Sequence, residues 1–455
     1  MSDDVGPAPA SPWSGALTTV GRNGVAVAPR AVQAEAAYRS YEVHQRLRVA
    51  QSTEKLDPSS LISEDFARDP YPVFVILREN YPCYRDWIGN AYWLTRYDDV
   101  TSVFVDDANF ETRTKLRTYG LDAFGRDLRD HPAVLAAGVA LVDRHAATVA
   151  HQIVDGFAGD GEADIATAFA ARYPLALLAR VLGLPDTEFD RFAALFWLAQ
   201  RGTHWRPAAR CAGAAALPAL ADLVRPHLEA RRREPGEDLL SVMAQAACDG
   251  GPVTAEDVAA TLLEMDHETL HGALANLWFL LLTRPGQLYC VATDRRLMKQ
   301  AYLETLRHSP PVLFARRFTR REVERFGLLL PEGALVICAA GAANRDPRLF
   351  SEPDIFQVER KDMCQREPRG QYRADGLPSG IAFGLGRPSR LPAEPDDRPR
   401  SLYAVTRDTA VAASTILLDR LADLRLKPGA EPRLRSLTAG EMHTCWSLQA
   451  VFRPA

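Results

Sequence analysis

Acidic side chains are concentrated in one short stretch of an otherwise apolar segment. Glu264, Asp266 and Glu268 are followed by Thr269, all within about one and a half turns of a predicted helix. Glu264 and Glu268 share a helical face, whereas Asp266 points elsewhere, so the acids cannot all face one cavity. We expect Asp266 to point inward, with Glu268 and Thr269 nearby. A carboxyl group desolvated by apolar walls has a raised pKa and can act as a general acid; the alternative is a solvated or salt-bridged helix face.

A second set of charged side chains has the spacing of a structural ion pair. Glu304 and Arg307 lie three residues apart in a predicted helix, where their side chains are neighbours. Arg360 could complete a buried network that fastens the following loops to the core. The alternative is an incidental surface pair, because Glu and Arg at this spacing are common. We predict a scaffold role for the three residues.

Asp106 and Asp107 form an acidic pair shortly before Phe110. Paired carboxylates can coordinate a hard cation such as Mg²⁺. The pair is superficially similar to the Asp-rich motif with which terpene cyclases hold magnesium and diphosphate. The alternative is an acidic turn without a metal.

The elements that must position these residues are mainly helical. Apolar residues recur at spacings of three and four, which predicts helices at 163–181, 192–199, 212–228, 255–282, 296–306 and 402–421. Short strands are predicted at 92–95, 103–105 and 447–452, with a hairpin of 328–330 and 335–337 around Pro331 to Gly333. The order of segments predicts one continuous domain over 32–455. Residues 1–31, rich in Gly, Pro, Ala and Ser, predict a disordered tail.

Composition excludes several classes of protein. With 47% hydrophobic and 25% charged residues, the chain can bury a sizeable core and is neither disordered nor membrane-embedded. A net charge of -4 gives no reason to expect a nucleic-acid partner. The longest apolar stretch, 274–282, is shorter than the ~20 residues of a membrane span, and the N-terminus lacks the pattern of a secretory signal. Seven scattered cysteines without a C-x-x-C pair indicate reduced thiols in a cytoplasmic protein.

Several phrases occur in the order and at the spacing typical of bacterial cytochromes P450. They are Asp69–Pro72, Leu263–Thr269, Glu304–Arg307, Ala343–Pro347, Phe350–Arg360 and Phe383–Gly386. Over roughly residues 65–452 the chain resembles this family, which implies a mainly α fold with small β-sheets in a single domain. The resemblance also implies that Glu268 and Thr269 match the pair that delivers protons to bound oxygen. The acidic turn before Phe110 is common in the family.

The chain departs from the family at the haem ligand. In the family the Phe-Gly-x-Gly turn is followed, four residues after its second Gly, by a cysteine whose thiolate binds the haem iron. Phe383, Gly384 and Gly386 match the turn, but Arg390 stands in the cysteine's place and 387–400 contains no cysteine. A guanidinium is always cationic and cannot ligate iron. The sequence therefore predicts an altered haem-binding loop at 387–400 and a chain without haem.

Two further departures favour the same prediction. Met265 and Asp266 stand where the family has a small residue and then Gly beside the haem, and their side chains would obstruct that space. The segment from His131 to Ala137 lacks the basic run that binds the haem propionates in the family. The remaining basic candidates are Arg144, His145 and Arg316.

Three functions stay open. The first is a haem-independent enzyme of bacterial specialised metabolism, an acid- or metal-assisted cyclase or isomerase of a small apolar terpenoid or polyketide-like substrate, with Asp266, Glu268 and Thr269 as catalytic residues. The second is a non-catalytic auxiliary partner that activates a glycosyltransferase. Cysteine-less relatives of the family resemble such auxiliary proteins. The third is an orthodox P450 monooxygenase with an unusual ligand loop. We favour the first, with no cofactor apart from a candidate Mg²⁺.

Overall fold

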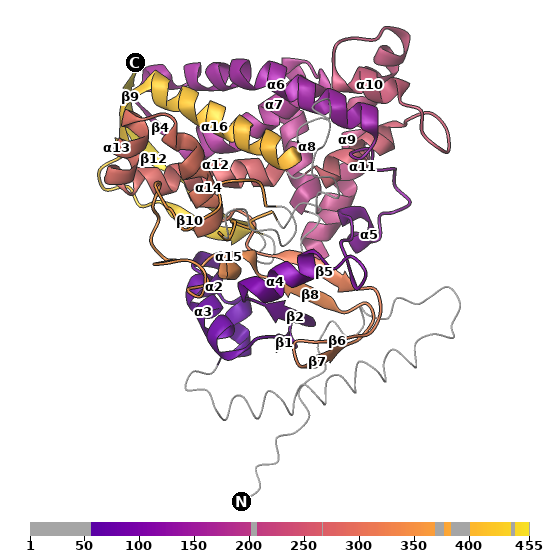
Figure 1. The fold of residues 1–455 in the computed structure, drawn as a ribbon. Helices are drawn as coiled ribbons and strands as arrows, with labels where there is room; N and C mark the ends of the chain where they lie inside the picture. The colour runs from indigo at the N-terminus through magenta and orange to yellow at the C-terminus, as the bar shows by residue number, and fades with distance from the viewer. Residues whose placement is uncertain are drawn as a thin grey trace, which may run out of the picture.

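The chain folds into a large helical part and four small β-sheets, as the sequence predicted (Figure 1). The computed structural model describes residues 56–201, 207–265, 267–368, 377–383, 401–437 and 442–454. The tail predicted at 1–31 and the altered loop predicted at 387–400 lie outside these residues. In Figure 1 most long helices lie in the upper part, and the largest sheet lies in the lower part.

Long helices form the body of the fold. They are α6 (Pro132–Asp155), α7 (Arg172–Leu182), α8 (Phe189–Arg201), α9 (Pro207–Arg233), α11 (Ala255–Glu264), α12 (His267–Leu282), α14 (Leu297–His308) and α16 (Leu402–Arg420). The shorter ones are α2 (Glu64–Arg68), α3 (Tyr71–Asn80), α4 (Tyr97–Phe104), α5 (Lys115–Tyr119), α10 (Leu239–Gln245), α13 (Pro285–Thr293) and α15 (Ala340–Ala343). Single turns are η1 (Pro58–Ile62), η2 (Ala158–Asp160), η3 (Ala166–Ala171) and η4 (Asp186–Glu188).

Helix α12 is the centre of the core. Its residues Ala273, Leu274, Leu277, Trp278 and Leu281 are fully buried, and it contacts α7, α14, α16 and strand β11 (Met442–Ser447). A helix that is apolar on every face must be covered on every face, which explains its central place. Helix α16 lies along α6 across the upper part of Figure 1.

The largest sheet has the strand order β1-β2-β8-β5-β3. Its strands are β1 (Tyr84–Asp86), β2 (Ala91–Leu94), β8 (Leu335–Cys338), β5 (Ala315–Thr319) and β3 (Phe110–Glu111), and only the β2-β8 pair among them is parallel. The smaller sheets are β4-β12-β9 (Glu162–Asp164, Gln449–Pro454, Leu421–Leu426), β10-β11 (Arg433–Leu437 with Met442–Ser447) and β6-β7 (Val323–Arg325, Leu328–Leu330).

Two strand predictions are wrong. The predicted strand 103–105 falls largely in α4, because Tyr97, Val100 and Phe104 bury their side chains at helical spacing. The predicted hairpin is also wrong, since β7 pairs with β6 and β8 pairs with β2 and β5. Between β6 and β7 the two turn residues Phe326 and Gly327 both have positive φ, 57° and 73°, as a tight hairpin turn requires.

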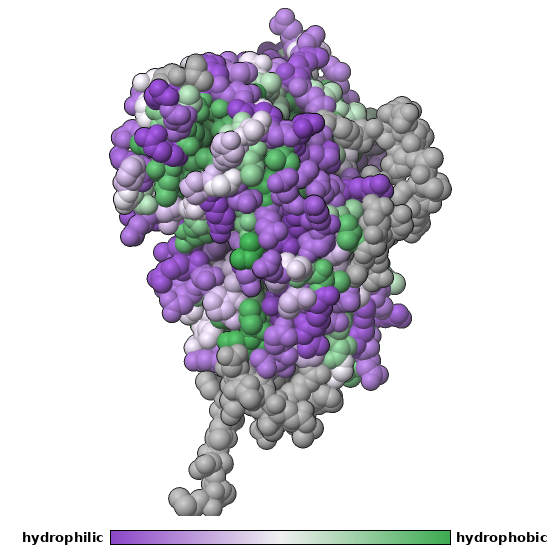
Figure 2. Space-filling model, turned by 60° about the vertical axis from the view of Figure 1, so that its left-hand side comes forward, coloured by the Kyte–Doolittle hydropathy of each residue, from purple (hydrophilic) through white to green (hydrophobic). Residues whose placement is uncertain are grey.

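One described helical stretch, Pro132–Asp160, is long and apolar enough to cross a membrane by length and composition. Its most apolar window has a mean hydropathy of 1.4 and is 28% buried, and one face of α6 packs against α7, α10 and α16. The face in Figure 2 is mainly hydrophilic, with hydrophobic residues in separate patches. The stretch is therefore weak evidence for a membrane span.

Asn276 joins α12 to two other segments. Its side chain is fully buried; Nδ2 donates to the carbonyl oxygens of Ser309 (2.9 Å) and His443 (3.0 Å), and Oδ1 accepts from the Cys445 amide (3.1 Å). Burying an amide is favourable only when its polar atoms are paired, as they are here. Asn276 thus fixes β11 and the end of α14 against the central helix.

Replacing Asn276 by Leu is expected to lower the free energy of unfolding by about 3 kcal/mol, because buried polar groups of Ser309, His443 and Cys445 lose their partner. Chemical denaturation would measure the change. Asn80→Leu, at a partly exposed position in the last turn of α3, serves as the control and should change stability by less than about 1 kcal/mol. Equal stability of the two variants would contradict this account of Asn276.

Candidate functional site

The helix predicted at 255–282 is interrupted where the sequence places its acidic cluster. Helix α11 ends at Glu264, its C-cap Met265 has extended backbone (φ -73°, ψ 118°), and α12 begins at His267. Asp266 lies outside the described residues. Glu268 is in the first turn of α12, and Thr269 follows it with a partly exposed side chain.

Polar side chains from other segments cap the interrupted helix. The last carbonyl groups of a helix have no partner within it. Gln200 of α8, which is 1% exposed, donates from Nε2 to the carbonyl oxygen of Leu263 (3.0 Å) and, at 3.4 Å, to that of Met265. Arg129 donates to the carbonyl oxygen of Glu264 (2.7 Å). The interruption is therefore built into the fold by specific donors.

Glu264 is part of this cap and is not available for chemistry. Its carboxylate accepts from the Leu116 amide (2.6 Å) and lies 3.4 Å from Nη2 of Arg129. The prediction that Glu264 shares a helical face with Glu268 is wrong, because α11 ends between them. The periodicity of apolar residues continues across the interruption, so it could not reveal it.

An aromatic cluster that the sequence analysis missed lies two residues beyond Thr269. His271 of α12 is 1% exposed and packs edge-on against Trp197 of α8 (5.6 Å between ring centroids) and Trp446 of β11 (5.4 Å). Burial lowers the pKa of His271 to about 4, so the imidazole is neutral near pH 7. The cluster makes this part of the molecule apolar, and it joins residues from three separate segments, which sequence periodicity does not reveal.

The structure brings Glu304, Arg307 and Arg360 together. Arg307 holds Glu304 through two bonds, Nε to Oε2 (2.7 Å) and Nη2 to Oε1 (2.8 Å), and Arg360 Nε donates to Oε1 (3.0 Å). The side chains of Glu304 and Arg307 are both 0% exposed. Burial alone would lower the pKa of Arg360, but Glu304 and then Asp362 raise it above its ordinary value.

The remaining donors of this network organise the chain after α15. Arg307 Nη1 donates to the carbonyl oxygens of Asn344 (3.0 Å) and Pro353 (2.8 Å), and Arg360 Nη2 donates to that of Ile355 (2.8 Å). Asn344 Oδ1 in turn accepts from the Ile381 amide (2.9 Å). The network therefore reaches the segment that leads into the Phe-Gly-x-Gly turn.

Of the Phe-Gly-x-Gly turn that precedes the predicted loop, only Phe383 is described. The ring of Phe383 contacts that of Tyr403 at the start of α16 (6.4 Å between centroids), while Gly384, Gly386 and Arg390 lie outside the described residues. The two ends of the loop thus lie close together.

Burial raises the pKa of Cys338 and of Cys445 to about 12, so these thiols stay protonated near pH 7. The loop that faces the iron in the family is not among the described residues.

Asp106 and Asp107 occupy a turn. The Asp106 carboxylate accepts from Asn109 Nδ2 (2.8 Å) and from Arg325 Nη1 (2.9 Å), and the Asp107 carbonyl accepts from Arg320 (2.9 Å). In the described part of the chain, no group of three or more His, Cys, Asp or Glu side chains could hold a metal ion. These contacts match the acidic-turn alternative.

The basic candidates for a carboxylate clamp are dispersed. Arg144 is exposed and pairs with Glu237 at 2.7 Å, so it faces outward from α6. Burial, then repulsion by Arg180 and Arg144, lowers the pKa of His145. Arg316 lies in β5, opposite Ile337, with a partly buried side chain. Of the three residues, Arg316 lies in the largest sheet, whereas Arg144 and His145 lie in α6.

Comparison with known proteins shows which class of protein the chain is similar to. The family model described as Cytochrome P450 matches residues 292–373. Pulcherriminic acid synthase of Bacillus subtilis (strain 168) is 24% identical over 389 residues, covering 81% of this chain and 92% of that protein. Cytochrome P450 monooxygenase PikC of Streptomyces venezuelae is 27% identical over 411 residues, covering 83% and 92%. The solved structure of CalO2 has a TM-score of 0.69 at 27% identity, covering 88% of this chain and 99% of that one.

The fold is therefore the cytochrome P450 fold in a single domain, as predicted. Taken together, the family model, the relatives and the solved structures strongly support membership of the P450 superfamily. The relatives include pulcherriminic acid synthase and PikC, and the metabolic setting of this chain stays a prediction.

The prediction that haem is absent is wrong at the level of the family, because the homologues are P450s, whose cofactor is haem. The prediction rested on Arg390 in the cysteine's place and on the lack of a cysteine in 387–400. Phe383 and Tyr403 are in contact although residues 384–402 separate them, so counting along the chain does not fix which residue would hold the iron. The haem-independent cyclase and the glycosyltransferase auxiliary receive no support from the comparisons.

Replacing Glu304 by Gln is expected to lower the free energy of unfolding by about 3–5 kcal/mol, because Arg307 and Arg360 keep their charges and lose the buried carboxylate. Urea denaturation would measure it. The control is Glu188→Gln, which removes a partly exposed pair at the same spacing along the chain, 4.0 Å from Arg191, and should cost less than about 1 kcal/mol. Loss of stability no greater than the control's would show that the network contributes little.

Proposed function

We propose that this protein is a P450-type monooxygenase of bacterial specialised metabolism, with haem as cofactor, a small apolar substrate and an unusual ligand loop. The observation that carries the proposal is similarity to P450 proteins over more than four fifths of the chain. The intact network around Glu304 supports it, because this network orders the segment leading to the ligand loop. A cytoplasmic location is part of the proposal.

Haem, when bound, supplies the activation of molecular oxygen. The protein's own residues would bind the substrate and supply protons. The aromatic cluster of Trp197, His271 and Trp446 excludes water and favours an apolar substrate. Asp266, Glu268 and Thr269, at the interruption between α11 and α12, are the proposed residues for proton delivery.

The ligand loop is the unusual part of the proposal. We infer that the family's ligand cysteine is missing, since Arg390 occupies its position in the sequence and all seven cysteines lie outside 384–400. Both ends of the loop are anchored, at Phe383 and at Ser401, whose hydroxyl caps α16 (3.1 Å from the Ala404 amide) and donates to Glu367 (2.8 Å). A loop with fixed ends and a variable length can present a different residue to the core.

The purified protein, produced in cells supplied with a haem precursor, is expected to contain about one haem per chain, as family membership implies. Absorption spectroscopy and extraction of the porphyrin would measure the content, and carbon monoxide added to the reduced protein should shift the haem band. Colourless protein without extractable porphyrin would end the proposal of a monooxygenase.

Asp266→Asn, Glu268→Gln and Thr269→Ala are each expected to keep the haem band and lower turnover by about 10²-fold or more, the usual contribution of a proton-transfer group. Product formation with a supplied electron donor, compared with haem content, would measure the effect. Thr293→Ala, at the exposed end of α13, is the control and should leave turnover unchanged. Full activity in all three variants would remove them from the mechanism.

A further inference from the structure

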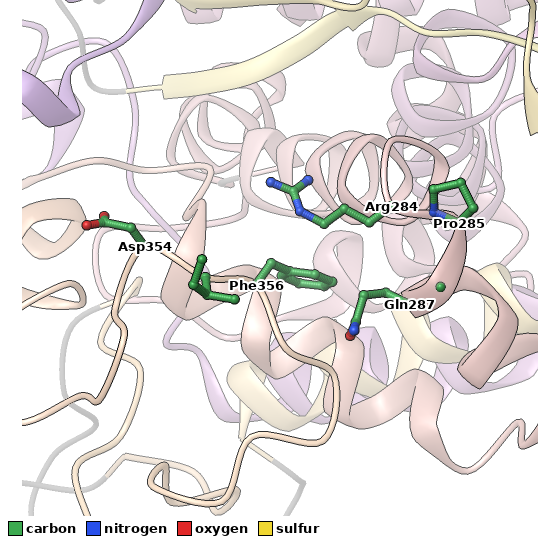
Figure 3. A pocket seen from close by; sticks show the side chains of 7 residues that line it. Arg284, Pro285, Gln287, Asp354 and Phe356 are labelled. Carbon is green, nitrogen blue, oxygen red and sulfur yellow. The ribbon is translucent and has the colours of Figure 1, made fainter.

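A pocket of about 370 Å³ lies beyond the end of α12 opposite to the acidic cluster, between the first turn of α13 and the segment 354–356 (Figure 3). Its wall combines apolar side chains, Pro285, Ile355 and Phe356, with the guanidinium of Arg284. The volume falls in the range of sites for small organic molecules. No function described above uses this pocket.

Arg284 is a cation without a matching anion. Its Nη1 donates to Thr283 Oγ1 (3.0 Å) and, at 3.5 Å, to the carbonyl oxygen of Leu280, and no described carboxylate lies within ion-pair distance. Burial and then repulsion by Arg345 lower the pKa of Arg284. A half-buried guanidinium with unused N–H groups gains much from a carboxylate that binds it through two bonds.

The nearest acidic residue of the pocket is already engaged. Asp354 accepts from Arg345 Nη1 at 3.1 Å, and in Figure 3 its carboxylate points away from Arg284. The other polar lining residue, Gln287, accepts from the Val358 amide (2.7 Å). The pocket therefore keeps an excess of positive charge, to which the amino-terminal end of α13 adds.

The apolar wall sets the second requirement for a ligand. Ile355 is 50% exposed, and the ring of Phe356 lies under Arg284 with its centroid 5.7 Å from the guanidinium carbon. A flat or branched apolar group can cover Ile355 while a carboxylate meets Arg284. From these observations we propose that the pocket binds a small organic monocarboxylate with an aromatic or branched apolar group.

Binding there would act on the scaffold. The Ile355 carbonyl accepts from both Arg307 (3.2 Å) and Arg360 (2.8 Å), and the Asp354 carbonyl accepts from His308 (3.0 Å). A ligand held between α13 and this segment therefore stabilises the fold by mass action on the native state. The proposal is independent of haem content and of monooxygenase activity.

Benzoate is the probe for the test, with benzamide as its neutral counterpart, on the full chain. Saturation-transfer NMR and thermal unfolding should detect benzoate at about 1–10 mM and a higher melting temperature with it. Arg284→Gln should weaken benzoate binding at least about tenfold. The control Arg296→Gln, at a 90% exposed side chain paired with Asp294, should leave it unchanged.

A second variant keeps the proposal testable if Arg284→Gln does not fold. Ile355→Glu places a carboxylate at an exposed position of the wall, so the chain should fold, and repulsion should abolish benzoate binding. Benzoate binding equal in wild type and both variants, equal binding of benzamide, or no benzoate binding at about 10 mM would overturn the proposal.

Discussion

One buried carboxylate, that of Glu304, fixes the loop-rich segment 344–360 against the helical core. It accepts two bonds from Arg307, one from Arg360 and one from the Gln357 amide (3.1 Å), all within a fully buried environment. Removing such a charge from water is costly, and only this number of charge-assisted bonds makes it tolerable. Both arginines also donate their other N–H groups to carbonyl oxygens of 344–355, so the same network orders this segment.

The interruption between α11 and α12, at the start of the central helix, is likewise stabilised by polar side chains from other segments. Apolar packing alone would favour one continuous helix, since Leu262 and Leu263 in α11 and Ala273 and Leu274 in α12 are all buried. The interruption is stable because Gln200 and Arg129 donate to the carbonyl groups that a helix end leaves unpaired. Polar side chains brought from distant segments therefore decide the backbone path beside the proposed site.

Sequence reasoning predicted what depends on local patterns and missed what depends on distant partners. The helices at 402–420 and 297–308 and the pairing of Glu304 with Arg307 follow from periodicity and spacing within one segment. The interruption at Met265 depends on Gln200, and the strand partner of β8 depends on β2, more than 200 residues earlier. The sequence analysis did not single out Arg284, because the lack of a counter-ion for its guanidinium depends on the residues that surround it in the fold.

The ligand loop illustrates the same limit at the point that matters most for function. A sequence motif specifies how many residues separate its members, whereas a metal ligand must lie at a particular position in space. Phe383 and Tyr403 pack against each other, and this contact does not depend on how many residues separate them in the sequence. Closing a longer loop costs little additional free energy, so the number of residues between two anchored ends can differ among related proteins. Arg390 therefore identifies a change in the motif, and the relationship of the whole chain to P450 proteins carries more weight for the cofactor than that one position.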